Sequence, residues 1–402
     1  MVQTASREAR GPLTQAFFDR IAAVAEGEKL KACIQCGICS GSCPLGFAMQ
    51  YPPRRLIASL RAGVMEQVLQ SNTPWLCVAC YTCTARCPSA VGITDMLFPA
   101  MREALLMQGV GVPGELQTAL ENTFRHGNPL GEPPSKRADW IQEVDVPVTD
   151  LSADPREVDI LWLVECYPAY HVRAKETVKA LARTLHALGA DFGVLGQEER
   201  CVGDSQRLVG ENGLFEMLVE ENGKTLDRFQ FRQIIVTDPH AYNALKNEYP
   251  KYGVNYPVQH YTQYLASRLE ELRPMLGELN HTITFHDPCY LGRRNGEYEA
   301  PRQLIQAIPG VTFVEMERNR ENGLCCGGGG GGMWLDSFAY EYAKERLSEK
   351  RVREAARTGA DVMAVCCPND LLRFEDAVKV VGLEGKLVVK DIIELIDEAR
   401  KG

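Results

Sequence analysis

Cysteine is the residue type through which this chain could do chemistry. The 402 residues include 15 cysteines, and eight of these fall into two runs of identical spacing. The first run reads CIQCGICSGSCP and contains Cys33, Cys36, Cys39 and Cys43; the second reads CVACYTCTARCP and contains Cys77, Cys80, Cys83 and Cys87. The other seven are spread over residues 166–367. An odd total, with no signal-peptide core at the start, predicts metal or redox chemistry rather than a secreted disulfide framework.

The spacing C-x2-C-x2-C-x3-C-P is typical of bacterial ferredoxins, in which three cysteines bind one [4Fe–4S] cubane and the fourth binds the other. It predicts two clusters with crossed ligand sets. The first set is Cys33, Cys36, Cys39 and Cys87, and the second is Cys77, Cys80, Cys83 and Cys43. Structural zinc is the alternative, because C-x2-C pairs often bind zinc. Two identical runs, each followed by proline, favour clusters and therefore electron transfer.

A third cysteine motif reads GLCCGGGGGGMW, in which Cys325 and Cys326 precede six glycines. Adjacent cysteines could supply two sulfurs to one cluster, and glycine lets backbone amides approach inorganic sulfide because it has no Cβ. A phosphate-binding loop would place Lys-Ser/Thr after the glycines, where Met333 and Trp334 stand. A vicinal disulfide and a zinc site are also open interpretations of the motif.

These motifs need elements to position them. Between the two N-terminal runs, residues 52–76 have helical periodicity, with apolar residues on one side at Leu56, Ile57, Leu60, Val64 and Val68. We therefore expect an α-helical ferredoxin domain over residues 1–110. Residues 111–156 are rich in proline and glycine and predict an extended linker.

After the linker, apolar strand candidates alternate with helical stretches, which predicts an α/β domain. The strand candidates are VDILWLVEC (158–166), RQIIVTD (232–238), HTITFHDPC (281–289), ADVMAVCC (360–367) and KLVVKDI (386–392). The helical stretches include residues 174–192 and 338–358.

The α/β region contains an internal repeat. In its second half Cys289 ends a strand, and the motifs GLCCGG and AVCCPND follow; in the first half VECYPA, ERCVGD and VTDPHAYN take the same order. Aligning Pro239 with Pro368 places Asp238 on Cys367. We expect two halves related by a pseudo-twofold axis, a degenerate one over 157–280 and a cluster-bearing one over 281–402.

The pattern of Cys, Cys-Cys-Gly and Cys-Pro resembles the cysteine-rich CCG domain, and the whole chain resembles the D-type subunit of heterodisulfide reductase. The resemblance implies a third [4Fe–4S] cluster, noncubane or cubane, bound by Cys289, Cys325, Cys326 and Cys367. The family pattern expects a further cysteine where this chain has Asp370. Either Asp370 or Cys366 could complete the ligand set. His286, which precedes Cys289 by three residues, could deliver protons there or make an outer hydrogen bond.

Two functions follow. In the first, the chain is an electron-transfer subunit that passes electrons through two cubanes to a third cluster. In the second, that cluster reduces a heterodisulfide or another thiol/disulfide substrate; a zinc-stabilised scaffold is a third interpretation. No NAD or FAD fingerprint is present, so we expect a flavoprotein partner and a membrane or acyl-CoA reductase module.

The charge and composition limit which partners and which cellular location we expect. A net charge of −9 argues against nucleic acid as a partner, and no stretch of about 18 apolar residues is present. We expect a cytoplasmic protein, or one that reaches a membrane through partner subunits. Cys166 and Cys201, in the degenerate half, are either buried remnants of a lost cluster site or a redox-active pair.

Overall fold

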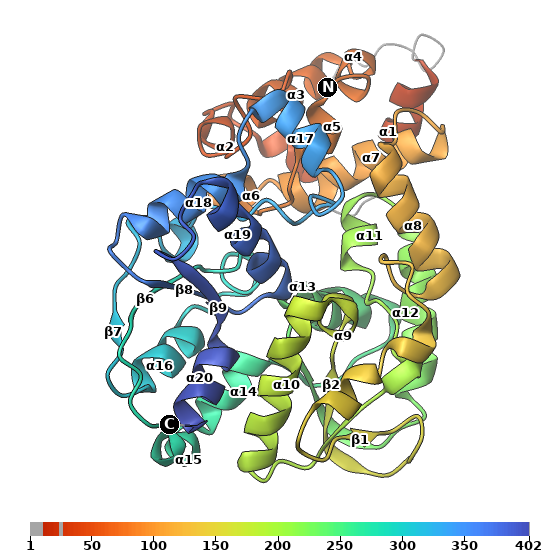
Figure 1. Ribbon diagram of the computed structural model, residues 1–402. Helices are drawn as coiled ribbons and strands as arrows, with labels where there is room; N and C mark the ends of the chain where they lie inside the picture. Colours follow the sequence, from red (N-terminus) through yellow and green to blue (C-terminus); the bar gives the residue numbers. More distant parts are fainter. Residues whose placement is uncertain (1–10, 24–26, 402) are drawn as a thin grey trace. The chain divides into compact units, whose positions relative to one another are not determined.

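The computed structural model describes residues 11–23 and 27–401, and the chain divides into two compact units (Figure 1). Unit 1 contains residues up to 118 together with 205–215 and 327–347, and unit 2 contains 119–204, 216–326 and 348 onward. Each unit therefore combines several chain segments, whereas the predicted boundaries at 110, 156 and 280 divide the chain sequentially. The expectation of no export signal rests on residues 1–17, of which residues 1–10 lie outside the described residues.

Unit 1 is helical, as expected for the N-terminal domain. Its helices are α1 (Pro12–Ala23), α2 (Ile38–Gly41), α3 (Pro53–Ala62), α4 (Glu66–Leu69), α5 (Thr73–Leu76), α6 (Thr82–Ala85), α7 (Phe98–Met107) and α17 (Asp336–Ala343), with short turns η2 (Gly27–Ala32) and η3 (Ile93–Leu97). The chain also passes between the units within α8 (Gly114–His126), α11 (Asp204–Leu208), α12 (Asn212–Leu226) and α18 (Leu347–Ala356).

Helix α3 follows the predicted periodicity for three of its apolar residues. Leu56, Ile57 and Leu60 are buried, whereas Val64 is 53% exposed. The helix ends at Ala62 because Gly63 takes a left-handed conformation, with φ of 74°. The predicted apolar side was therefore wrong at Val64, which lies beyond the C-cap and outside the helical period.

Arg102 in α7 links three segments of unit 1. Its side chain is 0% exposed, and it donates to the carbonyl oxygens of Pro74 (2.7 Å), Cys77 (2.5 Å), Leu208 (2.9 Å) and Gly330 (3.0 Å). The guanidinium group carries five N–H donors in a rigid plane, so one side chain can satisfy carbonyls from several segments. Residues 205–215 and 327–347 are held to the second cysteine run in this way.

The glycine run also belongs to unit 1 from Gly327 onward. A Cβ atom on Gly330 would lie 2.8 Å from the carbonyl oxygen of Cys77, and one on Gly332 would lie 2.0 Å from the carbonyl oxygen of Gly327. Gly330 also has a φ of 57°, in the left-handed region. The glycines are therefore required for close packing against the second cysteine run and within their own loop. Their expected role beside a third cluster stays a prediction.

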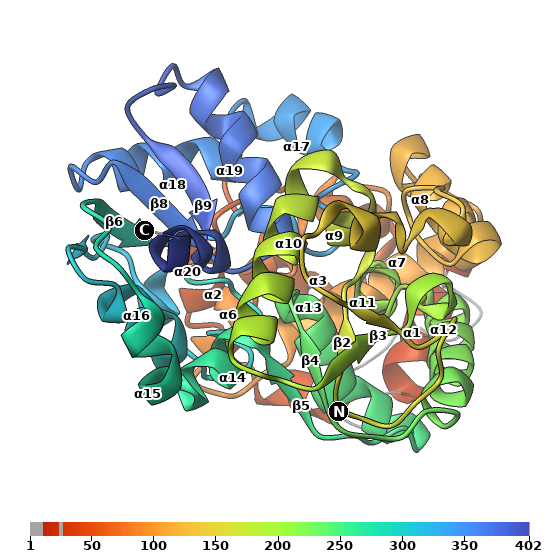
Figure 2. The same cartoon turned by 60° about the horizontal axis from the view of Figure 1, so that its bottom comes forward.

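Unit 2 contains two parallel sheets. The first has strand order β1-β3-β2-β4-β5 and the second β7-β6-β8-β9 (Figures 1 and 2). The strands are β1 (Thr149–Asp150), β2 (Val158–Leu163), β3 (Phe192–Val194), β4 (Phe231–Val236), β5 (Val258–His260), β6 (Thr282–Phe285), β7 (Thr312–Phe313), β8 (Val362–Val365) and β9 (Val388–Asp391). All five predicted strands are present, in β2, β4, β6, β8 and β9.

Helices and short turns connect these strands. The helices are α9 (Cys166–Tyr170), α10 (Val172–Ala187), α13 (Pro239–Asn243), α14 (Tyr261–Ser267), α15 (Leu269–Leu272), α16 (Glu299–Ala307), α19 (Pro368–Val380) and α20 (Ile392–Lys401). The turns are η4 (Pro134–Lys136), η5 (Asp139–Glu143), η6 (Gly196–Glu198), η7 (Ala244–Glu248), η8 (Tyr249–Tyr252), η9 (Arg273–Met275) and η10 (Arg320–Asn322).

The two sheets repeat one topology. The order β3-β2-β4-β5 in the first matches β7-β6-β8-β9 in the second, and every pairing is parallel. Runs such as the fully buried Val362–Val365 suit a parallel sheet that is covered on both faces. The shared strand order supports the duplication seen in the cysteine motifs, and the pseudo-twofold axis stays a prediction.

Polar contacts join the two repeats. Helices α10 and α20 pack side by side (Figure 1), and Arg173 donates to both carboxylate oxygens of Glu394, at 2.6 and 2.9 Å. The hydroxyl of Tyr261, the first residue of α14 after β5, donates to Asp391 at the end of β9. Burial raises the pKa of Asp391 to about 7, and the hydrogen bond from Tyr261 opposes this rise.

The segment 111–156 is more regular than an extended linker. It contains helix α8, the turns η4 and η5, and strand β1, which pairs with β3. Trp140 within it is buried and packs edge-on against Trp162 of β2, with ring centroids 5.5 Å apart. Burial of this aromatic pair anchors the segment to the first sheet, which composition alone did not predict.

Substituting Gly330 tests the packing of the glycine run. Gly330→Ala should destabilise the protein more than Gly63→Ala, because both introduce a Cβ at positive φ but only Gly330 has backbone within 3 Å. We expect about 1 kcal/mol for Gly63→Ala from left-handed strain, and about 1–3 kcal/mol more for Gly330→Ala from overpacking. Thermal unfolding midpoints of the two variants would measure this difference, and equal midpoints would contradict it.

Asp391→Asn should remove a pH dependence of stability. A carboxyl whose pKa is raised from about 3.9 to about 7 on folding contributes stability below pH 4, and that stability is lost as pH rises through 7. Wild type should therefore lose stability relative to Asp391→Asn between pH 5 and 7, by at most about 1.4 kcal/mol per pH unit. Tyr261→Phe should shift this range upward, because it removes a hydrogen bond that lowers the pKa. Urea unfolding across pH 5–8 would reveal parallel curves if the assignment is wrong.

Candidate functional site

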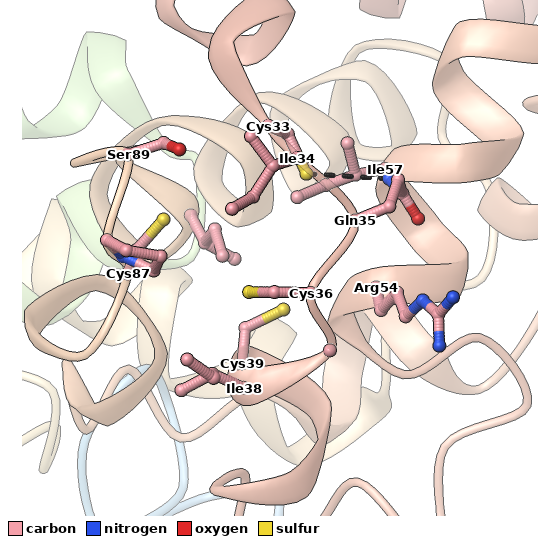
Figure 3. Close-up of a pocket in the computed structure, with 13 residues that line it drawn as sticks. Cys33, Ile34, Gln35, Cys36, Ile38, Cys39, Arg54, Ile57, Cys87 and Ser89 are labelled. Atoms are coloured by element: carbon pink, nitrogen blue, oxygen red, sulfur yellow. Dashed lines mark hydrogen bonds between the residues drawn. The ribbon is translucent and has the colours of Figure 1, made fainter.

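Two cavities in unit 1 are lined by the eight N-terminal cysteines. The space not filled by atoms is about 340 Å³ in the first and about 330 Å³ in the second, and both volumes include some open solvent. Cysteines from both runs line each of them: the first has Cys33, Cys36, Cys39 and Cys87, and the second has Cys77, Cys80, Cys83 and Cys43. Figure 3 shows the sulfurs of Cys36 and Cys39 pointing toward the space that Cys87 faces from the other side. Each cavity thus brings together three cysteines of one run and the last cysteine of the other.

The backbone of the two runs curls in the same way. Gln35 and Ala79, the second residues after the first cysteine of each run, have φ of 59° and 49°. Gly37 and Tyr81, two residues further on, have φ of 87° and 65°. A non-glycine residue at positive φ is strained and is retained only where its surroundings require it. Left-handed residues at matching positions let three successive cysteines turn toward a single cavity.

Hydrogen-bond donors approach the thiols of both runs. The backbone N–H groups of Ala79 and Val91 donate to the sulfurs of Cys77 and Cys87 at 3.4 Å, and the Gln35 amide donates to Cys33 at 3.4 Å (Figure 3). Burial raises the pKa of Cys77 to about 11, and the charge of Arg102 opposes that rise. Donors around sulfur and a buried setting are the features by which a protein tunes a thiolate-bound cluster.

The donor set suits a cluster. Within the part of the chain that the structure describes, no three or more His, Cys, Asp or Glu side chains are arranged to hold a single metal ion. The cysteines instead surround two spaces with four sulfurs each. Four thiolates around a shared cavity are the ligand set of a [4Fe–4S] cubane.

The predicted ligands of the third cluster are brought together less completely than the two N-terminal sets. Cys325, Cys326 and Cys367 are buried, and Cys326 hydrogen-bonds to both Cys325 and Asp370. Burial raises the pKa of Cys367, and the charges of Asp370, Asp238 and Cys326 raise it further. Cys289 is buried as well and follows β6 in a loop. The contacts among the thiols therefore bring together three of the predicted ligands with Asp370.

Asp370 occupies the first turn of α19, where the family pattern expects a cysteine. It is 2% exposed, and its Oδ2 atom is buried with no hydrogen-bond partner. Burial raises the pKa of this carboxyl, and the neighbouring Cys326 raises it further. An orphaned acid oxygen beside thiols can serve as a ligand atom. The strongest charges acting on Cys366 come instead from Asp391, Asp370 and Asp287.

One ring nitrogen of His286 faces Asp370, and the other is bound by Arg351. Its Nδ1 atom accepts a hydrogen bond from Arg351 at 3.1 Å, and its Nε2 atom lies 3.6 Å from Asp370 Oδ2. Burial lowers the pKa of His286, and the Arg351 charge lowers it further. A neutral imidazole fixed by a guanidinium is suited to orienting Asp370. This geometry favours the outer role of His286 over proton delivery.

A second histidine approaches Cys289 from the first repeat. His240 stacks on Tyr290, with ring centroids 4.0 Å apart, and its Nδ1 atom lies 2.7 Å from Asp204 Oδ2. Burial alone would lower the pKa of His240, but the hydrogen bond and charge of Asp204 outweigh burial and raise it. The carboxylate therefore fixes the ring beside the residue that follows Cys289.

Sequence reasoning missed the charged residues that organise these sites. Arg102 and Asp204 did not stand out, and neither did Arg137, which lies 3.7 Å from the Cys166 sulfur, because each acts on residues far away in the sequence. Only the position of Asp204, three residues after Cys201 in the repeat motif, offered a signal. The buried arginines lie in segments with no local pattern of their own.

Comparisons with known proteins agree with this organisation. Residues 29–91 match the 4Fe-4S dicluster domain family, and residues 160–246 and 283–373 each match the cysteine-rich domain family CCG. The matched ranges lie within the predicted ferredoxin domain and the two predicted halves. These matches define the chain as an iron–sulfur protein with a [4Fe–4S] dicluster domain and two CCG domains.

Three relatives extend the comparison over most of the chain. The probable iron-sulfur-binding oxidoreductase FadF of Bacillus subtilis is 31% identical, covering 93% of this chain and 60% of its own length. The EtfAB:quinone oxidoreductase of Syntrophomonas wolfei is 33% identical, covering 92% and 58%. The D-type subunit of the dihydromethanophenazine:CoB–CoM heterodisulfide reductase of Methanosarcina barkeri is 30% identical, covering 92% and 94%.

The last match covers nearly all of both chains. This protein therefore belongs to the family of iron–sulfur oxidoreductases that includes the D-type heterodisulfide reductase subunits. It spans about three fifths of the length of the first two relatives. Among the described helices, none has the length and apolar character needed to cross a bilayer.

Proposed function

We propose that this chain is an electron-transfer subunit that passes electrons through two [4Fe–4S] cubanes to a third cluster. The cavity linings carry the proposal. Each places four sulfurs around one space, with the last cysteine exchanged between runs. Crossed ligands of this kind tie the two clusters into one rigid unit.

The third cluster is proposed at Cys289, Cys325, Cys326 and Cys367. Support comes from the buried group that Cys325, Cys326 and Cys367 form with Asp370. Asp370 is the proposed additional ligand because its buried Oδ2 atom has no hydrogen-bond partner, and its polar neighbour His286 Nε2 lies 3.6 Å away. Cys366 is disfavoured, since no thiol is among the charges acting most strongly on it, whereas Cys326 is among those acting on Cys367. The family relation leaves two forms open, a cubane and a noncubane cluster.

A [4Fe–4S] cluster supplies one-electron transfer, and the chain supplies its environment. Arg102 places positive charge near Cys77, and the N–H groups of Ala79 and Val91 donate to cysteine sulfurs. Such donors stabilise the more negative, reduced state and so raise the reduction potential. The cluster in the second cavity has the buried guanidinium beside it, so we expect it to have the higher potential of the two.

The second candidate is reduction of a thiol or disulfide substrate at the third cluster. The observation that favours it is the carboxyl group of Asp370 in place of a cysteine. A carboxylate binds iron less strongly than a thiolate does, because iron–sulfur clusters favour soft sulfur ligands. Such a position could be displaced by a substrate sulfur. His240, fixed by Asp204 beside Tyr290, would lie close to such a substrate.

The partners follow from the family. The name of the Syntrophomonas relative pairs EtfAB with quinone. We propose that a flavoprotein exchanges electrons with this chain, and that a membrane or acyl-CoA reductase module lies at the other end. The shorter length of this chain relative to that protein leaves such a module to a partner or to sequence outside this chain.

Paired cysteine substitutions test the crossed ligand sets. Wild type should contain about twelve irons if all three clusters are present. Cys33→Ala with Cys87→Ala removes two ligands of one proposed cluster and should cost about four irons, whereas Cys77→Ala with Cys87→Ala affects both clusters and should cost about eight. Iron and sulfide analysis of anaerobically purified protein gives the counts.

The same variants separate crossed sets from uncrossed ones. If each run bound its own cluster, Cys33→Ala with Cys87→Ala would affect both clusters and lose about eight irons, whereas Cys77→Ala with Cys87→Ala would affect one and lose about four. Cys366→Ala is the control, because this buried thiol is disfavoured as a ligand, and it should keep the wild-type iron content. A colourless wild-type protein with bound zinc would overturn the proposal.

Stepwise oxidation of the reduced protein distinguishes the electron-transfer function from the catalytic one. We expect the reduced protein to give the same EPR signals on oxidation with and without an added thiol or disulfide. A paramagnetic species that appears only with thiol would identify a substrate-binding third cluster and favour catalysis. In that case Asp370→Cys, which supplies the cysteine of the family pattern, should abolish the species while keeping the iron content.

A further inference from the structure

The first repeat contains a buried group that the proposed electron path does not use. Cys166 begins α9 shortly after strand β2, and the thiol of Cys201 hydrogen-bonds to its sulfur. Cys166 is 6% exposed, whereas Cys201 is partly exposed. Neither belongs to a proposed cluster, and together they offer two neighbouring sulfurs, one of them on a partly exposed residue.

A guanidinium group is aimed at this pair. Arg137, 2% exposed, places its Nη1 and Nη2 atoms 3.8 and 3.7 Å from the Cys166 sulfur. The Nη2 atom also donates to Glu199 Oε1 at 2.7 Å. Glu199 is held in turn by the backbone N–H groups of Val164 at 2.9 Å and Glu165 at 2.6 Å. The arginine is therefore fixed by a carboxylate that is itself fixed by the backbone.

Several features of this site would not be expected if Cys166 and Cys201 were only buried remnants of a lost cluster site. Burying an arginine costs several kcal/mol unless an anion compensates for it; Glu199 supplies that anion, and the guanidinium nevertheless also lies 3.7 Å from the Cys166 sulfur. The Nε atom of Arg137 and the Oε1 atom of Glu165 are buried without hydrogen-bond partners. Glu165 also has a φ of 64°, a strained conformation that tends to occur at functional sites.

The electrostatics of the two thiols differ in the way a reactive pair requires. The hydrogen bond from Cys201 lowers the pKa of Cys166, burial opposes this, and the charge of Arg137 lowers it again. The same hydrogen bond and burial raise the pKa of Cys201. The negative charge of Glu199 raises the pKa of Cys166, but the ion pair between Glu199 and Arg137 offsets this effect. The N–H group of Gly203 donates to the Cys201 sulfur at 3.4 Å.

We propose that Cys166 and Cys201 form a redox centre that cycles between a thiolate–thiol pair and a disulfide, with Arg137 holding the Cys166 thiolate. The co-reactant is a small organic disulfide. The partly exposed Cys201 gives its proton to Cys166 and attacks one sulfur of the disulfide, which releases a thiolate. That thiolate takes the proton back from Cys166. The Cys166 thiolate then attacks Cys201 and releases the second thiolate.

The atoms and electrons of this step balance. One S–S bond of the organic disulfide breaks and one S–S bond forms in the protein, so two electrons pass to the co-reactant. The single proton of the pair leaves on one product as thiol, and the other product leaves as thiolate. Reduction by a dithiol reverses the step. The centre therefore carries electrons in pairs, in contrast to the one-electron clusters proposed elsewhere in the chain.

Peptide mapping of the holoprotein tests the centre directly. The anaerobic protein is equilibrated in buffers of reduced and oxidised dithiothreitol, quenched in acid, alkylated and digested. A peptide linked through Cys166 and Cys201 should appear as the buffer becomes more oxidising. The ratio of linked to unlinked peptide should follow a two-electron Nernst curve, with a tenfold change for each ~30 mV of buffer potential. Cys366, buried elsewhere in unit 2, should stay a thiol throughout. If both cysteines remain fully alkylated in every buffer, the proposal is wrong.

Matched variants test the role of the arginine. Arg137→Met with Glu199→Gln removes both charges together, so no unpaired charge is left buried. Disulfide formation with bis(2-hydroxyethyl) disulfide at pH 7 should slow by about tenfold or more, as the thiolate fraction falls. Arg137→Lys keeps a cation and should restore most of the rate. Arg228→Met, at an exposed ion pair with Glu198, should leave it unchanged. Equal rates in wild type and all three variants would overturn the assignment to Arg137.

Iron analysis keeps this proposal separate from the cluster proposal. Cys166→Ser and Cys201→Ser should each abolish the linked peptide and retain the wild-type iron content. Loss of iron in either variant would make these cysteines cluster ligands and would overturn the redox pair. Failure of the three-cluster proposal would appear instead in the iron content of wild type.

Discussion

A buried guanidinium group is the constraint on which unit 1 depends. Arg102 binds backbone carbonyls from the second cysteine run, from residue 208 and from the glycine run. A buried carbonyl left without any partner costs about 1–3 kcal/mol, so one side chain offsets several such costs. Two segments from distant parts of the chain are thereby tied to the thiols of Cys77 and its neighbours. The glycine run is part of the same arrangement, because only a chain without Cβ atoms can approach Cys77 so closely.

Duplication explains the architecture of unit 2, and divergence explains its chemistry. The two sheets share strand order, yet the residues at the ends of matching strands have different roles. Asp238 caps α13 by accepting a hydrogen bond from the His240 N–H, whereas the matching Cys367 begins α19 without a capping bond from its side chain. A carboxylate at this position stabilises a helix; a thiol at this position is available as a ligand.

Sequence reasoning succeeded where chemistry is local in the chain. The spacing of the N-terminal cysteines predicted which thiols should share a space, and the cavity linings agree with those sets. Five strands were predicted because buried parallel strands are continuous apolar runs. The strands β1, β3, β5 and β7 were not predicted, because a strand of two or three residues is too short to show a periodic pattern of apolar residues. The helix α8 was missed because proline and glycine around it dominated the composition.

What could not be predicted is the pairing of charges over long distances. Arg137 lies in a proline-rich segment, yet its partners Cys166 and Glu199 are 29 and 62 residues away. Nothing in the local pattern distinguishes it from the solvated arginines near it. The same holds for Asp204, which acts on His240. Buried charges are costly and are retained only with partners, so each such pair marks a place where the fold has been fixed for a purpose other than burial. Among the described residues, Arg102 lies beside Cys77 in unit 1, and Arg137 lies beside Cys166 in unit 2.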